Sequence, residues 1–167
     1  MKKIIHIPTI ALACLLSAEL SGSDVFTQKN IGLEAANDIA RMSIDACRKD
    51  GFNVSVVVVD KHGNVRSVMR DDHAAKYTTE IAQRKANMVV MSGIASGAFK
   101  AARTDIQQEL NHIEGLIVMQ GGLPILASGI VIGAVGVSGA PGGDKDEACA
   151  AVAIKAMTER LAFAGED

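Results

Sequence analysis

Tryptophan is absent from this sequence, and aromatic residues of all kinds make up only 3% of its 167 positions. Basic runs are missing too, because no stretch of lysine and arginine is longer than a pair, and the formal net charge is -2. Domains that bind nucleic acid usually carry a basic patch or aromatic side chains on which bases stack. The composition therefore argues against a nucleic-acid partner.

Apolar runs long enough to cross a membrane are also lacking. The stretch Ile4 to Leu16 follows Lys2 and Lys3 and leads into small residues, but a spanning helix needs about 20 apolar residues. A basic start, a short apolar stretch and small residues are typical of a secretory signal peptide. We expect residues 1–23 to be a signal peptide and residues 24–167 to form one domain. The mature protein is then periplasmic or secreted, with no membrane span.

Cysteine is scarce, and Cys14 falls within the predicted signal peptide, which leaves Cys47 and Cys149. These two residues belong to the first and the last predicted helix. An oxidising compartment permits a disulfide, but the two cysteines could bond only if the two helices lie side by side. We favour the other interpretation, in which both are small buried hydrophobic residues.

Hydrophobic residues (49%) and charged residues (22%) are balanced as in a compact globular domain. Apolar residues at three- and four-residue spacing predict helices over 26–50, with Thr27 as the N-cap, over 74–91 and 96–110, and from Asp144 to about Leu161. Runs rich in β-branched residues between turn residues predict strands over 54–59, 65–69, 116–119, 123–127 and 130–137. Strands joined by tight turns pair antiparallel. The predicted fold is α+β, a five-stranded antiparallel sheet with the N- and C-terminal helices packed on it and two central helices.

Glycine is concentrated between Gly121 and Gly139, where it alternates with branched residues. A glycine inside a strand often marks the close approach of another backbone or of a ligand. We expect these strands to form the scaffold and the floor or rim of a pocket, and their glycines to let helices with small residues approach the sheet. The small residues of those helices are Ala36, Ala40, Cys149 and Ala153.

Motifs of the common catalytic sites are not found in the sequence. Ser138 lacks the spacing of a nucleophile elbow, no glycine turn leads directly from a strand into a helix as dinucleotide sites require, and the histidines are too scattered to predict zinc. No catalytic residue is predicted, and His62 is interpreted as a solvated turn residue. Acidic residues near the helix starts, at positions 71, 72, 144, 146 and 147, are interpreted as partners of the helix dipoles.

Two longer segments carry a resemblance to a known family. The segment GGLPILASGIVIGAVGVSGAPGGDKDEACAAVAIKAM and the hairpin VSVVVVDKHGNVRSVMRDD, together with the R-x-D-x-A corner at Arg70 and the pair Lys85-Ala86, resemble the GlcG/HbpS family. The likeness runs from about Leu33 to Leu161. It implies a profilin-like fold, homo-oligomers and haem binding.

On this resemblance we expect an exported haem-binding protein, a haem carrier, a store or a component of a redox or haem sensor, with a sensor or transport protein as a further partner. The alternatives are an enzyme or enzyme accessory that acts on a small organic acid or another cofactor, a haem-degrading activity, and a structural partner without a ligand. A carboxylate could be held by Arg70, His73 and Lys85. Enzymatic activity is the less favoured interpretation.

The sequence also departs from the family pattern. His73 stands where many members have glycine, and Asn87 and Met88 stand where members often have a hydroxyl-bearing segment. Histidine and methionine are ordinary haem ligands, so His73, Met88 and His112 are the candidate iron ligands. The full set of predicted haem-binding residues is Arg70, His73, Lys85, Met88, His112, Gly121 and Gly122.

Overall fold

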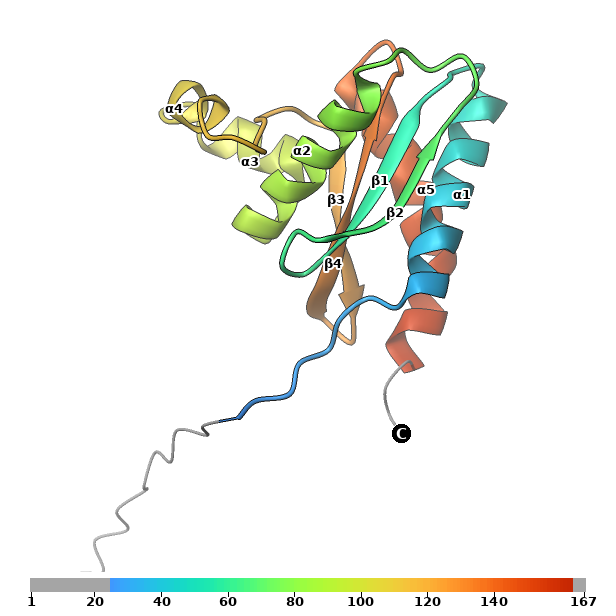
Figure 1. Ribbon diagram of the computed structural model, residues 1–167, viewed down its shortest axis with the longest axis vertical. Helices are drawn as coiled ribbons and strands as arrows, with labels where there is room; N and C mark the ends of the chain where they lie inside the picture. The colour runs from blue at the N-terminus through green and yellow to red at the C-terminus, as the bar shows by residue number, and fades with distance from the viewer. Residues whose placement is uncertain (1–24, 164–167) are drawn as a thin grey trace, which may run out of the picture.

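Within residues 25–163, which the computed structural model describes, four strands form an antiparallel sheet (Figure 1). The sheet order is β2-β1-β4-β3, and each neighbouring pair is antiparallel. The strands are β1 (Ser55–Asp60), β2 (Val65–Arg70), β3 (Gly122–Ala127) and β4 (Ile130–Ser138). The predicted signal peptide, residues 1–23, lies outside the described residues.

Helices cover both faces of this sheet. On one face α1 (Leu33–Lys49) and α5 (Gly143–Phe163) lie side by side, and α2 (Thr78–Ser92) crosses the other face (Figure 1). Two short helices, α3 (Ser96–Ala102) and α4 (Gln107–Asn111), project beyond the edge of the sheet. The predicted α+β class, the antiparallel pairing and the packing of the terminal helices on the sheet are confirmed.

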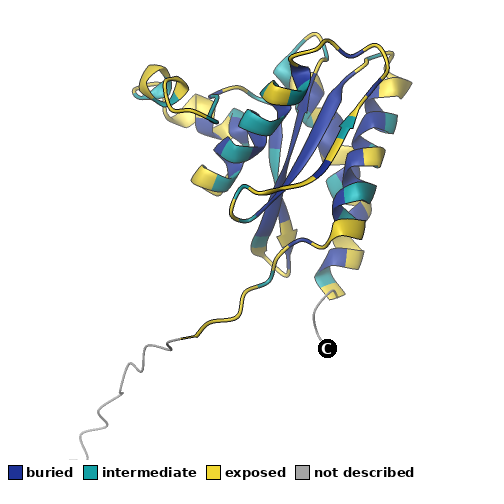
Figure 2. Cartoon of the chain, in the orientation of Figure 1, coloured by how far each residue is buried: buried dark blue, intermediate teal, exposed yellow. Residues whose placement is uncertain are grey.

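The central strand β1 explains why its sequence is a continuous apolar run. Val56 and Val58 face α1 and α5, whereas Val57 and Val59 face Ala82 and neighbouring residues of α2. All six β1 residues are buried (Figure 2). A strand covered on both faces has no solvent side, so it has no alternation of apolar and polar residues.

Gly136 of β4 allows a helix to approach the sheet closely, but that helix is α2. A Cβ atom on Gly136 would lie 1.9 Å from the carbonyl oxygen of Ala82, so only glycine fits against the α2 backbone there. The expected partners, Ala36 of α1 and Ala153 of α5, are buried in the core on the opposite face. The expectation that the terminal helices meet this glycine is therefore wrong.

The predicted fifth strand at residues 116–119 does not form, so the described part of the chain has one strand fewer than expected. Its backbone is engaged locally, since the Val118 amide donates to Oδ1 of Asn111 at 2.7 Å. Val118 also packs against Met88 and Phe99. A four-residue apolar run carries too little information to distinguish a strand from a buried loop.

Three helix boundaries also differ from the predictions. The first helix begins at Leu33, not at residue 26, with Gly32 instead of Thr27 as its N-cap, because the preceding residues run beside β4 and the Ile31 amide donates to the carbonyl of Ile132. The second helix begins at Thr78, after turns over residues 71–77. The predicted helix over 96–110 is two helices, since Arg103 leaves the helical conformation.

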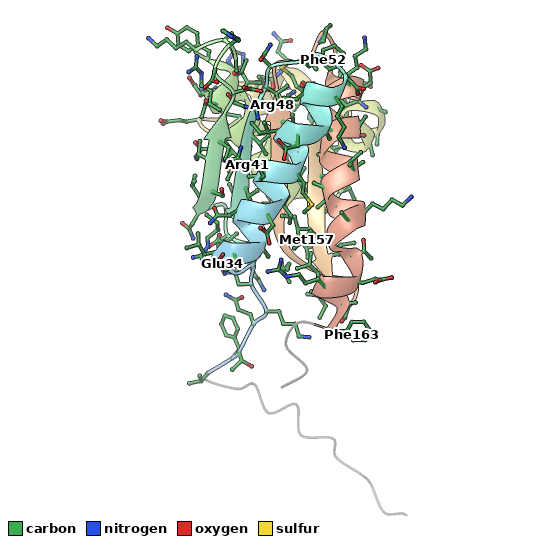
Figure 3. All side chains as sticks on the ribbon, turned by 90° about the vertical axis from the view of Figure 1, so that its right-hand side faces the viewer. Glu34, Arg41, Arg48, Phe52, Met157 and Phe163 are labelled. Atoms are coloured by element: carbon green, nitrogen blue, oxygen red, sulfur yellow. A yellow bond between two sulfur atoms is a disulfide. The ribbon has the colours of Figure 1, made fainter. Side chains whose placement is uncertain are left out.

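Cys47 and Cys149 form a disulfide that joins α1 to α5, with 5.3 Å between their Cα atoms. Figure 3 shows the two helices side by side with the sulfur–sulfur bond between them. The favoured interpretation, two unbonded small hydrophobic residues, is wrong. The cause is tertiary, because the antiparallel packing of α1 and α5 brings the end of one helix level with the start of the other.

None of the helices in the described range combines the length and the apolar character that a membrane crossing requires.

Candidate ligand-binding site

Three of the predicted haem-binding residues, Lys85, Gly121 and Gly122, meet in one buried cluster. Lys85 is 1% exposed, and its Nζ donates to Oδ2 of Asp146 at 2.7 Å and to the carbonyl of Val137 at 2.9 Å. Gly121 has a φ of +125°, and a Cβ atom there would lie only 2.7 Å from Nζ. Glycine at this position therefore leaves room for the ammonium group.

The other polar groups of this cluster are also satisfied within the chain. The Gly122 amide donates to Oγ of Ser96 at 2.8 Å, and the second carboxylate oxygen of Asp146 accepts from the Ala140 amide at 2.9 Å. The cluster ties α2 and β4 to the first turn of α5. Asp146 is thus the counter-ion of a buried lysine, not a surface partner of the helix dipole.

Arg70 and His73 lie at the corner between β2 and α2, away from that cluster. Nη2 of Arg70 donates to the carbonyl of Ala74, and His73 is exposed. Beside them Arg48 of α1 donates two hydrogen bonds to the carboxylate of Asp71, at 2.8 and 2.9 Å. These bonds lower the pKa of Asp71 to about 2, and the same pairing raises the pKa of Arg48. The ion pair between Arg48 and Asp71 therefore links the end of β2 to α1.

The candidate iron ligands are not brought together. Met88 is fully buried in an apolar cluster with Phe99 and Val118, and His112 is exposed at the end of α4. In Figure 1 the segment between β2 and α2 runs over the top of the sheet, whereas α4 projects to the left beyond α3. Over the described range, no group of three or more histidine, cysteine, aspartate or glutamate residues is placed to hold a metal ion.

An open pocket of about 460 Å³ lies at the other end of the α1–α5 pair. It lies between the start of α1, the last turns of α5, the end of β3 and the start of β4. Figure 3 shows Glu34 and Phe163 at this end of the two helices. Its apolar walls and polar rim come from separate residues. The apolar part of the lining consists of Leu33, Ala35, Ala127, Ile132 and Leu161, with Gly32. The polar part consists of Lys29, Asn30, Glu34 and Arg160.

A second hollow of about 500 Å³ shares Lys29 with this pocket and is lined by Gln28, Lys61 and Ile130 among others. The Gln28 side-chain amide donates to Nε2 of His62, so His62 adjoins the wall of this hollow. The turn residue interpreted as merely solvated therefore lies next to a concave surface.

Three cations, Lys29, Lys61 and Arg160, lie at this end of the molecule. Arg160 is paired with Asp38, but neither Lys29 nor Lys61 has an ion-pair partner among the described residues. Lys29 is half-buried and faces both hollows. The arrangement suits an apolar ligand that carries a carboxylate, because the walls and the ammonium group match its two parts.

Sequence reasoning missed these residues because it placed residues 26–32 inside a helix. The segment is extended, and Oδ1 of Asn30 accepts from the amides of Ile31 and Lys61 at 3.0 and 3.2 Å. One signal was available, since glycine is acceptable as an N-cap and Gly32 directly precedes the apolar repeat that begins at Leu33.

The sequence and the fold were also compared with those of known proteins. A family model described as haem degrading protein HbpS-like matches residues 31–155. The protein GlcG of Escherichia coli K12 is 28% identical over 112 residues, which cover 67% of this chain and 84% of GlcG.

Solved structures resemble most of the chain. A crystal structure of HbpS superimposes with a TM-score of 0.76 at 34% identity, covering 81% of this chain and 96% of HbpS. The crystal structure of a PduOC haem complex superimposes with a TM-score of 0.67 at 24% identity, covering 76% of this chain and 94% of PduOC. At that lower identity the likeness shows a common fold.

Proposed function

The chain belongs to the HbpS-like family, and from this premise we propose that it is an exported haem-binding protein. The observation that carries the proposal is the family match over residues 31–155, which runs from the approach to α1 through more than half of α5. Haem is named in the description of the family and in that of the PduOC complex. The expected role is that of a carrier, a store or a component of a haem or redox sensor.

The pocket at the start of α1 offers part of what haem needs, although its lining holds no histidine, methionine or cysteine for the iron. The flat ring of haem needs apolar contacts, which Leu33, Ile132 and Leu161 offer, and a propionate needs a cation, which Lys29 offers. Bound iron would supply redox chemistry. The protein's part is to hold the ring and neutralise the propionates.

The iron ligand is a separate question. His73 and His112 are exposed, but His73 lies beside the Arg48–Asp71 pair, at the opposite end of α1 from this pocket. Met88 is buried with Phe99 and Val118. His62 joins these candidates, because it adjoins the second hollow through Gln28.

Export is supported by the disulfide between Cys47 and Cys149, because disulfides persist mainly in oxidising compartments. Assembly into homo-oligomers is supported by the edge strand β2, where Val65 and Val68 are exposed on the face that α2 covers farther along the sheet. Light scattering of the purified mature chain measures the assembly.

The alternative role in binding a small organic acid through Arg70, His73 and Lys85 is less well supported. Lys85 is already neutralised by Asp146 and buried, and Arg70 is engaged with Ala74. These side chains therefore do not converge on an open pocket.

Titration of the mature protein with haemin tests the proposal. We expect a saturable shift of the Soret band, and loss of the ligand-specific spectrum in one of four single variants: His62→Ala, His73→Ala, Met88→Leu or His112→Ala. The other three variants are the matched controls. If the Soret band shows no saturable change with the wild-type protein, the proposed function is wrong.

A further inference from the structure

We propose that the pocket at the start of α1 is a separate binding site for a fatty-acid anion, whose carboxylate pairs with Lys29 and whose chain lies along the apolar wall. The inference goes beyond the proposed haem function and does not depend on it. Because the lining holds no histidine, methionine or cysteine, the pocket suits a ligand that is held without a bond to iron.

The apolar wall of the pocket is the part that receives the chain of the ligand. It includes Leu33 of α1, Ile132 of β4 and Leu161 of α5, which belong to three separate elements. Ile132 and Leu161 are buried members of the core, so the packing beneath them fixes their positions. The volume of about 460 Å³ lies within the usual range of small-molecule sites.

Exposed apolar side chains continue this surface outwards. Leu33 lines the pocket and Ile130 lines the second hollow, yet each is 51% exposed. Phe163, which is also exposed, lies at the same end of the two helices (Figure 3). Apolar surface in contact with water is unfavourable, and an alkyl chain that lies over it removes part of that surface from water.

Lys29 supplies the charge that a carboxylate needs. It is half-buried and faces both hollows, and no carboxylate lies within ion-pair distance of it in the described part of the chain. A partly desolvated ammonium group without a counter-ion is costly, and a ligand carboxylate would supply a charge-assisted hydrogen bond. Arg160 cannot take this part as readily, because it is engaged with Asp38.

Glu34 and Lys61 indicate which way the ligand lies. Glu34 is the one carboxylate among the described residues that line the pocket, and it repels a ligand carboxylate placed on its side. Lys61 lines the second hollow and, within residues 25–163, has no ion-pair partner either. The carboxylate therefore lies at Lys29, where the two hollows meet, and the chain points towards Leu33 and Leu161.

Titration calorimetry of the mature chain with decanoate tests the proposal without haem. We expect saturable binding with a negative change in heat capacity, because apolar surface is buried. From hexanoate to decanoate, each added methylene should lower the dissociation constant about two- to fourfold. Decan-1-ol, which keeps the chain and lacks the charge, should bind at least about tenfold more weakly than decanoate.

Two variants test the assigned residues. Lys29→Glu reverses the charge, and Leu33→Asp places a carboxylate on the apolar wall; Leu33 begins a helix, where aspartate is favoured, and is half exposed, so the fold is retained. We expect the dissociation constant for decanoate to rise at least about tenfold in each. The matched controls Lys100→Glu and Ile113→Asp, the latter at a residue 50% exposed, should stay within about twofold of the wild type.

The uncharged alcohol separates the role of the carboxylate from that of the chain. Lys29→Glu should leave the binding of decan-1-ol unchanged, whereas Leu33→Asp should weaken the alcohol as well as the acid. Hydrogen exchange locates the ligand, since bound decanoate should slow exchange over residues 27–36 in the wild type and not in Lys29→Glu.

Two results would overturn the fatty-acid site. One is the absence of saturable decanoate binding by the wild type, and the other is binding that neither Lys29→Glu nor Leu33→Asp weakens. Both leave the haem function standing, because the haemin titration is a separate measurement. A wild type that binds decanoate with the expected loss in both variants, and does not bind haemin, keeps this site and loses the haem function.

Discussion

Lys85 and Asp146 are almost completely buried, and each is the other's counter-ion. A buried ion pair adds little to stability when it is compared with two well-packed apolar residues, but removing one partner leaves the other charge uncompensated. This asymmetry decides how the cluster should respond to mutation.

We predict that Lys85→Met and Asp146→Asn each lower the free energy of unfolding by about 3–5 kcal/mol. The double variant Lys85→Met/Asp146→Leu should lose less than the sum of the two single changes, because it leaves no charge unpaired. Urea unfolding measures all three. Single losses below about 1 kcal/mol would contradict a buried, mutually dependent pair.

Asp71 makes stability depend on acid pH. Its pKa is about 2 in the folded protein, against a usual 3.8, chiefly because Arg48 donates hydrogen bonds to its carboxylate. The ionised form therefore favours the folded state. Its contribution is complete above about pH 4 and is lost as the pH falls towards about 2.

We predict that Asp71→Asn lowers stability at neutral pH and makes the loss of stability between pH 4 and pH 2 less steep. Urea midpoints measured at several pH values in that window test this. Asp72→Asn, a change at the exposed neighbour, should keep the wild-type dependence. An identical pH profile for the wild type and Asp71→Asn would rule out the assigned role.

At the scale of elements, the disulfide joins two helices that each cover the same face of the sheet. The cysteines are 102 residues apart in sequence, so the bond restricts a long loop in the unfolded chain. Such restriction stabilises the folded state mainly by lowering the entropy of the unfolded one.

We predict that Cys47→Ser/Cys149→Ser lowers the free energy of unfolding by about 2–5 kcal/mol. A thiol reductant should cause a similar loss in the wild type and none in the double variant. Denaturant unfolding with and without reductant gives the comparison. If thiol counting shows complete reduction and the wild-type midpoint does not move, the bond does not stabilise the fold.

The elements themselves were predicted unevenly from the sequence. The hairpin of β1 and β2, and strand β4, were found because continuous branched runs and turn glycines are local signals. The start of α1 was missed because Thr27 was interpreted as the N-cap, whereas a backbone hydrogen bond from Ile31 to Ile132 holds the preceding segment beside β4. The split between α3 and α4 had no clear marker in sequence.

At the scale of the whole molecule, the two ends of the α1–α5 pair differ in structure. The end near the start of α5 carries the disulfide and the Lys85–Asp146 pair. The opposite end carries the open pocket with Lys29 and Arg160.

Residue patterns within a few positions of one another determined the α+β class, the antiparallel hairpins and the resemblance to the GlcG/HbpS family. Only the tertiary structure decided the partner of Lys85, which is 61 residues away, the pairing of the cysteines and the place of the open pocket. The reason is that the periodicity of apolar residues indicates only which face of a helix or strand is buried. Which elements then become neighbours depends on the sheet order and on the packing of helices across it.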